Sequence, residues 1–363
     1  MLNFFTSALS KVFSNMTKLR RHIFKPYYKA SVPCICVGNL QVGGTGKTPT
    51  VLNIAKFLLE KGIRPFIVLR GYKGKAIGPV KVDRLDPIFF GDEALIYFRN
   101  GLDTIVSKNR LEGIKLACSL GAHIIFCDDG FQDLRVDYDK KILCFKPFKK
   151  EKDYSVFPKG ILRESLENSK FADYLLITKY NLYDKNVIER TVNMLEKYNS
   201  NIYLVPIKIK EIVNFYGEKL SSKDFENKNI YLISGIGDPR SFEKLINTEL
   251  NLKVKKHFEF KDHHYYTLKD IDNIYKQTQK ESLFFVTEKD FVKLHSILKS
   301  LNHPIKDNIA VVRTYLEVPK KIKKDILDLL KNLEKSSEEI LNFEPKIELE
   351  NETYRDCRSH KCR

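Results

Sequence analysis

A glycine-rich segment holds the residues best suited to bind a phosphate group. Residues 38–48 read G-N-L-Q-V-G-G-T-G-K-T and directly follow the β-branched run 32–37. Small residues let backbone N–H groups converge on phosphate oxygens, and a following helix start adds partial positive charge. Lys47 would reach the β- and γ-phosphates of ATP, and the Thr48 hydroxyl would coordinate Mg²⁺. The residues predicted to bind the nucleotide are Gly43, Gly44, Thr45, Gly46, Lys47 and Thr48.

One position departs from the usual phosphate-loop pattern. The consensus G-x-x-x-x-G-K-[ST] starts with a glycine six residues before the lysine, and Gln41 occupies that position here. A plain glycine-rich turn is therefore the alternative interpretation. The strand–loop–helix context and the intact G-K-T favour the phosphate loop.

A pair of carboxylates supplies a second element of the same chemistry. The apolar run 123–127 ends in Asp128 and Asp129. Carboxylates at the carboxyl end of a buried strand, beside a phosphate loop, are where Mg²⁺ is held in folds of this kind. Aspartate pairs also cap helices and begin turns, so the pair gains its meaning from Lys47 and Thr48. Asp128 and Asp129 are predicted Mg²⁺ ligands together with Thr48.

The elements around these motifs alternate between strand and helix patterns. The spacing predicts a parallel sheet with helices on both faces, of the P-loop NTPase type, followed by a second and smaller α/β domain. Between 208 and 228 the pattern is polar and irregular, which indicates a connection between domains. The predicted division is an N-terminal helix 1–30, a phosphate-loop domain 31–207, a linker 208–228, a second domain 229–334 and a charged tail 335–363.

The charge of the chain indicates polyanionic partners. Lys and Arg outnumber Asp and Glu by 63 to 46, which gives a formal net charge of +17. Such an excess favours nucleic acid, anionic lipid headgroups or phosphorylated substrates, or is a solvated lysine-rich surface. No recognition-helix, RNP-type or zinc pattern accompanies it, so a nucleic-acid-binding module is disfavoured.

The first thirty residues have the pattern of an amphipathic helix. Leu2, Phe5, Leu9 and Phe13 would share one face, and basic residues lie beside it. No apolar run is long enough to span a bilayer or to resemble a cleaved signal. The pattern fits a helix lying on an anionic membrane surface, and it also fits a helix docked on its own domain.

The seven cysteines suit a reducing compartment. Their number is odd, and most lie inside apolar runs such as 34–36 and 124–127. This usage favours buried, reduced thiols in the cytosol over a disulfide framework.

Eight short motifs, in order over roughly residues 1–330, resemble the tetraacyldisaccharide 4'-kinase family. Each alone is a weak signal, but the ordered set is specific. The Gln41 departure fits this resemblance, because the family's loop is similarly degenerate there. The motifs are V-G-N-L-Q-V-G-G-T-G-K-T-P (37–49), L-R-G-Y (69–72), G-D-E (91–93), D-D-G-F-Q-D (128–133), P-K-G-I-L-R-E (158–164), G-I-G-D-P-R-S-F (235–242), F-K-D-H-H-Y-Y (260–266) and T-E-K-D (287–290).

The resemblance implies a reaction and a location. The reaction is transfer of the ATP γ-phosphoryl group to the 4'-hydroxyl of tetraacyldisaccharide 1-phosphate, with an active site in the cleft between two α/β/α domains. The implied location is the cytoplasmic face of the bacterial inner membrane, with peripheral attachment. This location favours the membrane interpretation of the N-terminal helix.

The resemblance also assigns roles in that cleft. Asp92 is implied as the base that receives the hydroxyl proton, held by His263, with His264 as the alternative histidine. Glu93 is expected in the Mg²⁺ shell, or else as a helix N-terminal acid. Gln132 could orient phosphate or acceptor. Arginine forks match phosphate oxygens, and the three candidate anion clamps are Arg70, Arg110 and Arg163.

A second functional class stays open on the residues alone. A phosphate loop also serves nucleotide-hydrolysing switches and assembly factors, in which hydrolysis drives a conformational change. The sequence T-K-Y-N at 178–181 matches the guanine signature N/T-K-x-D only imperfectly. The two classes differ in where the γ-phosphate ends, on a lipid or in free phosphate.

Overall fold

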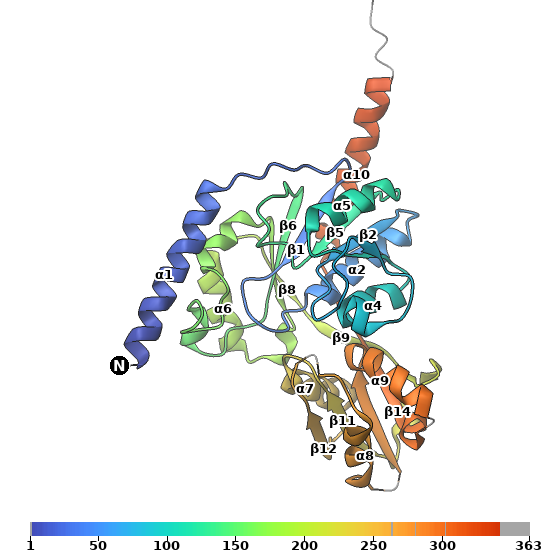
Figure 1. Cartoon of the computed structure of the whole chain (residues 1–363). Helices are drawn as coiled ribbons and strands as arrows, with labels where there is room; N and C mark the ends of the chain where they lie inside the picture. The colour runs from blue at the N-terminus through green and yellow to red at the C-terminus, as the bar shows by residue number, and fades with distance from the viewer. Residues whose placement is uncertain (1, 263, 280, 302, 342–363) are drawn as a thin grey trace, which may run out of the picture.

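The protein consists of two α/β domains, as predicted. The computed structural model describes residues 2–341 except residues 263, 280 and 302. The first domain is built on an eight-stranded sheet and the second on a six-stranded sheet, counted over these described residues. In Figure 1 the second domain lies below the first, and α4 of the first domain and β9 of the second lie near the junction between them.

The first sheet is parallel apart from one edge strand. Each neighbouring pair runs parallel except β3 and β4. In sheet order its strands are β3 (Val80–Lys81), β4 (Asp103–Val106), β2 (Pro65–Leu69), β5 (Ile124–Asp128), β1 (Cys34–Gly38), β6 (Lys140–Phe145), β7 (Tyr174–Thr178) and β8 (Ile202–Val205).

Alternate residues of each strand face opposite layers of helices. Ile35 and Val37 of β1 belong to one apolar cluster, and Cys34 and Cys36 belong to the other. Period-two alternation in a strand requires this division, and burial on both faces explains the almost unbroken apolar runs. The first cluster is covered by α2 (Lys47–Leu59), α4 (Asp92–Arg99) and α10 (Lys320–Leu341), and the second by α5 (Arg110–Ser119) and α6 (Lys185–Glu196). A short helix, α3 (Pro87–Phe90), precedes α4.

The second sheet combines parallel and antiparallel pairs. The strands β12, β11, β13 and β14 run parallel, whereas β9 pairs antiparallel with β14 and with β10. Its order is β10 (Lys219–Leu220), β9 (Ile207–Asn214), β14 (Ile309–Leu316), β13 (Ser282–Thr287), β11 (Asn229–Ser234) and β12 (Lys256–Glu259). One face packs on α7 (Pro239–Leu250) and the other on α8 (Leu268–Lys276) and α9 (Glu288–Leu301).

The structure divides the chain differently from the prediction at two points. The segment 208–228, expected to be a linker, contains most of β9 and all of β10, so it belongs to the second sheet. Its charged residues alternate with apolar ones, and β9 lies next to the edge strand, where exposed polar side chains are tolerated. The chain instead passes from one sheet to the other at Pro206, between β8 and β9.

The last helix returns to the first domain. Ile322 and Ile326 of α10 are fully buried in the same apolar cluster as residues of β1 and α2. The sequence division placed 320–334 in the second domain, because the helix follows β14 directly. In Figure 1, α10 extends away from the second domain and along the first. The two domains are therefore joined by two chain crossings.

The N-terminal helix α1 (Leu2–Ile23) lies along one side of the first domain (Figure 1). Arg21 donates to the Glu164 carboxylate at 2.7 Å, and its guanidinium lies 4.1 Å from the ring centroid of Phe131. The Ser10 hydroxyl donates to the backbone carbonyl of Val156 at 2.6 Å. One side of α1 is thus docked on its own domain, as one of the two interpretations expected.

We expect Ile322→Ala to destabilise the first domain by about 2–4 kcal/mol, because it removes a fully buried side chain and leaves a cavity. Hydrogen exchange should become faster in peptides from β1 and α2 and change little in peptides from β11 and β13. The exposed neighbour Lys321 provides the control, since Lys321→Ala should stay within about 0.5 kcal/mol of the parent. Faster exchange confined to β11 and β13 would contradict the assignment of α10 to the first domain.

Candidate active site

The phosphate loop and the aspartate pair meet at the carboxyl edge of the first sheet. Strands β1 and β5 are parallel neighbours, with Val37 opposite Asp128. The segments that follow them therefore leave the sheet side by side. Lys47 Nζ lies 3.5 Å from Asp129 Oδ1, which joins the two segments directly. Every residue predicted to bind the nucleotide, from Gly43 to Thr48, lines one cleft.

The phosphate loop has a preformed backbone. Gly46 adopts φ 82°, and a Cβ placed on it would lie 2.9 Å from Leu316 Cδ1. An L-residue is strained at this φ and would also clash there. The Thr178 hydroxyl donates to the backbone carbonyl of Thr45 at 2.8 Å. The loop is therefore held by a hydrogen bond from β7, and the end of β14 leaves no room for a side chain at Gly46.

Gln41 has a structural role that explains the departure from the consensus. Its side chain is fully buried, and its amide donates to the Lys146 carbonyl at 2.9 Å. Its Oε1 accepts the Lys146 N–H at 2.8 Å. The side chain thus completes both hydrogen bonds with the backbone that follows β6, which a glycine could not do. The loop start is fastened to the sheet at this point.

Asp128 presents an oxygen suited to a cation. Its Oδ2 accepts the Tyr97 hydroxyl at 2.7 Å, whereas Oδ1 is buried without a hydrogen-bond partner within the described part of the chain. Burial and then the nearby Glu93 carboxylate raise the pKa of Asp128 to about 6. An unpaired buried carboxylate oxygen is costly unless a cation compensates it. Hard oxygen ligands of this kind fit Mg²⁺, with Glu93 and Thr48 lining the same cleft.

Asp129 is held by two cations. Arg163 Nη1 donates to both carboxylate oxygens at 2.9 and 3.0 Å, and Lys47 lies on the same carboxylate. Burial alone would raise the pKa of Asp129, but Lys47 and Arg163 outweigh it and hold the pKa below its usual range. Asp129 also adopts φ 53°, a conformation that aspartate tolerates better than most residues. Arg163 is thereby placed in the cleft, at the phosphate-binding side.

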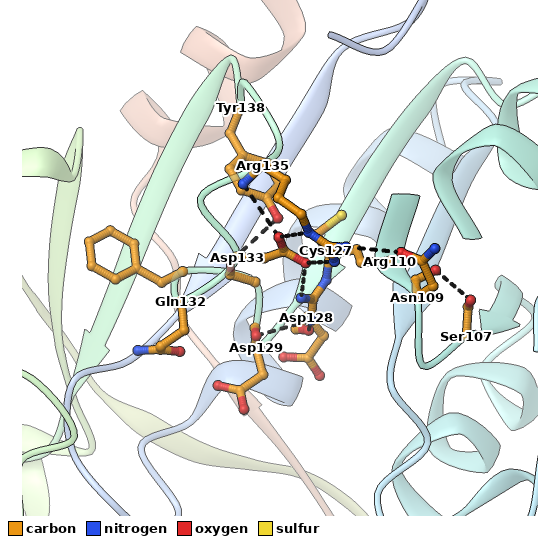
Figure 2. A network of polar contacts seen from close by, with 12 residues as sticks. Ser107, Asn109, Arg110, Cys127, Asp128, Asp129, Gln132, Asp133, Arg135 and Tyr138 are labelled. Carbon is orange, nitrogen blue, oxygen red and sulfur yellow. Dashed lines mark hydrogen bonds and ion pairs between the residues drawn. The ribbon is translucent and has the colours of Figure 1, made fainter. Parts of the chain in front are cut away.

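Arg110 lies elsewhere than the prediction of an anion clamp requires. Its side chain is only 1% exposed, and Nη2 donates to the backbone carbonyls of Asp128 and Asp129 at 2.9 and 3.0 Å. Nη1 pairs with the buried Asp133 at 3.4 Å. In Figure 2 the carboxyl groups of Asp128 and Asp129 point away from this guanidinium. Arg110 therefore braces the loop from behind, because its Nη1 and Nη2 groups both bond within the protein.

The remaining predicted phosphate or acceptor contacts have different surroundings. Arg70 is exposed and lines the cleft, in a position where it can reach an anion. Gln132 donates its amide to the Asn39 carbonyl at 3.0 Å, which links the loop after β5 to the end of β1. This bond is structural, and a contact of Gln132 with phosphate or acceptor stays a prediction.

The proposed base lies at the start of α4. Asp92 is 5% exposed, and its Oδ1 accepts the Glu93 N–H at 3.1 Å. Gly91 precedes it at φ 84°, and a Cβ there would lie 2.8 Å from the Tyr72 carbonyl oxygen. Only glycine permits this close approach, which brings the L-R-G-Y and G-D-E motifs together. Glu93 lines the cleft together with the residues predicted to bind the nucleotide.

Of the two histidines considered as partners of Asp92, one can be placed. His263 lies outside the described residues. His264 stacks on Phe260 with ring centroids 4.6 Å apart, and its Nε2 lies 3.1 Å from Asp270 Oδ2. Asp270 also caps α8 through Thr267. These contacts give His264 a structural task within the second domain.

The cleft is completed by residues of the second domain. It has a volume of about 670 Å³ and is lined from that domain by Gly237, Asp238, Asp262 and Lys289, among others. A Cβ on Gly237 would lie 3.4 Å from the Gly44 backbone nitrogen, so this loop closely approaches the phosphate loop. None of these four residues was predicted from the sequence to have a role in the site. The motifs G-I-G-D-P and T-E-K-D could have indicated such a role, because each lies at the end of a strand in a parallel sheet. Ligand-binding loops lie at that edge of such sheets.

Fold and site together define a P-loop phosphotransferase whose active-site cleft is formed by two domains. The model of the tetraacyldisaccharide-1-phosphate 4'-kinase (LpxK) family matches residues 2–331, and the chain belongs to this family. The tetraacyldisaccharide 4'-kinase of Bradyrhizobium diazoefficiens is 33% identical over 270 residues, covering 74% of this chain and 76% of that protein. The enzyme of the same name from Francisella philomiragia is 32% identical over 308 residues, covering 82% and 92%.

A solved structure agrees with the fold. The crystal structure of LpxK from Aquifex aeolicus in complex with ATP superposes with a TM-score of 0.69 at 26% sequence identity. The superposition covers 91% of this chain and 100% of the Aquifex aeolicus chain. The α/β architecture with a largely parallel first sheet is therefore shared.

We expect Asp128→Asn to stabilise the metal-free protein at pH 8 by on the order of 2–3 kcal/mol. The pKa of Asp128, raised to about 6, makes the folded state bind the proton more readily than the unfolded state. The stabilisation from this proton is present at low pH and is lost as the pH rises from about 4 to about 6. The gain should therefore shrink at pH 5, as urea unfolding in EDTA would measure.

Asp129→Asn provides the matched control with the opposite sign. The pKa of Asp129 is lowered, so its charge stabilises the folded protein, and the variant should be less stable at pH 8. Mg²⁺ should stabilise the parent protein more than Asp128→Asn. Equal stabilisation of both by Mg²⁺ would argue against Asp128 as a ligand.

Proposed function

We propose that the protein transfers the γ-phosphoryl group of ATP to the 4'-hydroxyl of tetraacyldisaccharide 1-phosphate, giving lipid IVA in lipid A biosynthesis. The observation that carries this proposal is the two-domain cleft, which contains a phosphate loop, an aspartate pair and the Asp92–Glu93 helix start. The family to which the chain belongs supplies the acceptor. The Aquifex aeolicus relative was solved in complex with ATP, which supports ATP as the phosphoryl donor.

The residues of the cleft are proposed to have separate roles in the reaction. Lys47 and the N–H groups of the loop bind the β- and γ-phosphates, while Arg163 and Arg70 contact phosphate oxygens from the facing side. Asp92 takes the proton of the 4'-hydroxyl as its oxygen bonds to the γ-phosphorus. The bond from that phosphorus to the β–γ bridging oxygen breaks, and ADP leaves. His263 is proposed to hold Asp92.

A divalent cation is part of this proposal. Asp128, Asp129, Glu93 and Thr48 are the residues proposed to hold Mg²⁺, directly or through water. When bound, Mg²⁺ neutralises charge that develops on the transferring phosphoryl group. The buried Asp128 Oδ1 supports this assignment, because it has no hydrogen-bond partner within the described part of the chain.

The helix α1 is proposed to attach the protein to an anionic membrane at the cytoplasmic face of the inner membrane. No helix among the described residues is long and apolar enough to cross a bilayer. The side of α1 away from its domain carries a stripe of apolar residues between 44% and 65% exposed: Leu9, Val12, Phe13, Met16, Leu19 and Ile23. An apolar stripe on a basic helix is typical of interfacial binding.

The kinase proposal is tested with Mg²⁺, γ-labelled ATP and detergent-dispersed tetraacyldisaccharide 1-phosphate. We expect label in the lipid fraction from the parent protein and at least a hundredfold less from Lys47→Ala and Asp92→Ala, because they lose phosphate binding and the base. Far-UV circular dichroism checks that both variants fold. Label released only as inorganic phosphate would instead support the nucleotide-hydrolysing switch.

The membrane proposal is tested with the double variant Val12→Ser and Met16→Ser, whose side chains are 58% and 63% exposed. Its affinity for vesicles that contain anionic phospholipid should fall at least tenfold in a sedimentation assay. Leu204→Ser with Leu268→Ser removes comparable exposed apolar side chains, each 44% exposed, from elsewhere. An equal loss in this control would show that the stripe on α1 has no special role.

A further inference from the structure

Two lysines of the second domain reach the proposed base of the first. Lys289 and Lys293 lie one turn apart on α9, and their Nζ atoms are 4.0 and 3.9 Å from Asp92 Oδ2. Residues four apart on a helix share a face, so both ammonium groups meet the same carboxylate. Lys289 lines the cleft, whereas Lys293 lies behind it and is only 3% exposed.

The position of Lys293 is determined by a buried network centred on Asp290. Asp290 is fully buried and lies 3.2 Å from Lys293 Nζ. Its carboxylate also accepts the Gly235 N–H at 2.9 Å, the Tyr266 hydroxyl at 2.9 Å and the Thr287 hydroxyl at 2.7 Å. A carboxylate with this many donors cannot turn freely, so it fixes the lysine beside it.

The charges explain why Lys293 faces Asp92. A buried ammonium is costly unless it is paired, and Lys293 has one carboxylate from each domain within 4 Å. Lys289 is shared between Asp92 and Asp262, the latter at 3.3 Å. Burial works against the charge of Lys289, but Asp92, Glu93 and Asp262 outweigh it, and its pKa lies above its ordinary value. Both lysines therefore form ion pairs with Asp92.

We propose that Lys293 is a positioning residue that holds the carboxylate of Asp92 in place from across the domain interface, with Lys289 as the second, cleft-facing contact. This inference rests on the proposed role of Asp92 as the base. Its consequence is that the base is correctly oriented only when α9 packs on α4, so the second domain controls acceptor activation as well as the shape of the cleft. The competing explanation is that Lys293 only neutralises the buried Asp290.

Three variants distinguish the two explanations. Lys293→Met removes the charge and leaves Asp290 uncompensated. Lys293→Met with Asp290→Asn removes both charges, while the Asn oxygen can still accept from Gly235 and Tyr266. Lys293→Arg retains the charge. For each variant we would measure the melting temperature, kcat and KM for ATP with the lipid acceptor, and hydrogen exchange in peptides that contain residues 91–96.

We expect Lys293→Met to lower kcat ten- to a hundredfold with KM for ATP within about twofold, and Lys293→Arg to retain most activity. The double variant should recover the melting temperature but not kcat. Recovery of kcat to within about threefold of the parent would show that Lys293 serves only Asp290 and would overturn the proposal.

Hydrogen exchange separates failure of this inference from failure of the proposed function. Exchange at the Glu93 N–H, which donates to Asp92, should be faster in Lys293→Met and in the double variant, whatever reaction the protein performs. Unchanged exchange in both variants would refute the positioning role. If the parent protein labels no lipid but exchange responds as expected, the acceptor assignment fails and the contact across the interface stands.

Discussion

The parallel pairing of β1 with β5 is the constraint on which the rest of the site depends. It places the ends of the two strands side by side, so the phosphate loop and the aspartate pair leave the sheet at one point. The contact between Lys47 and Asp129 follows from this arrangement. Arg110 then fixes the carbonyls of the aspartate pair from behind, and Gln41 fastens the loop to the backbone after β6. The side chains of Arg110 and Gln41 are both buried and bonded to backbone, which makes the carboxyl edge of the sheet rigid.

The carboxylates of the site differ in their environments although they are close together. Asp129 is surrounded by Lys47 and Arg163 and has a lowered pKa. Its neighbour Asp128 is buried beside another carboxylate and a tyrosine, and its pKa is raised. The environment of Asp129 favours an ionised carboxylate that holds Lys47 and Arg163 in place. The environment of Asp128 favours a carboxylate that gains from an added cation.

The second domain lines the cleft and also contacts the phosphate loop and Asp92 of the first domain. Its loop at Gly237 approaches the phosphate loop, and α9 brings lysines to Asp92. The two chain crossings, at Pro206 and after β14, connect the domains. The residues proposed to bind the nucleotide lie mainly in the first domain, whereas the proposed activation of the acceptor depends on contact between both domains.

The sequence by itself determined the local chemistry of this protein. The apolar runs, the G-K-T after a strand and the Asp128–Asp129 pair predicted the α/β class, the phosphate loop and the metal region, because these depend on short-range pattern. Tertiary structure decided what depends on distant neighbours. Arg110 looked like an anion clamp until its burial against backbone carbonyls was seen. The β9 segment was predicted to be a linker because its charged residues obscured the apolar pattern of a strand, and only the sheet order shows that it lies near a sheet edge. Lys293 had no signal of its own, since its meaning comes from Asp92, which lies about two hundred residues earlier in the chain and meets it only through packing of α9 on α4.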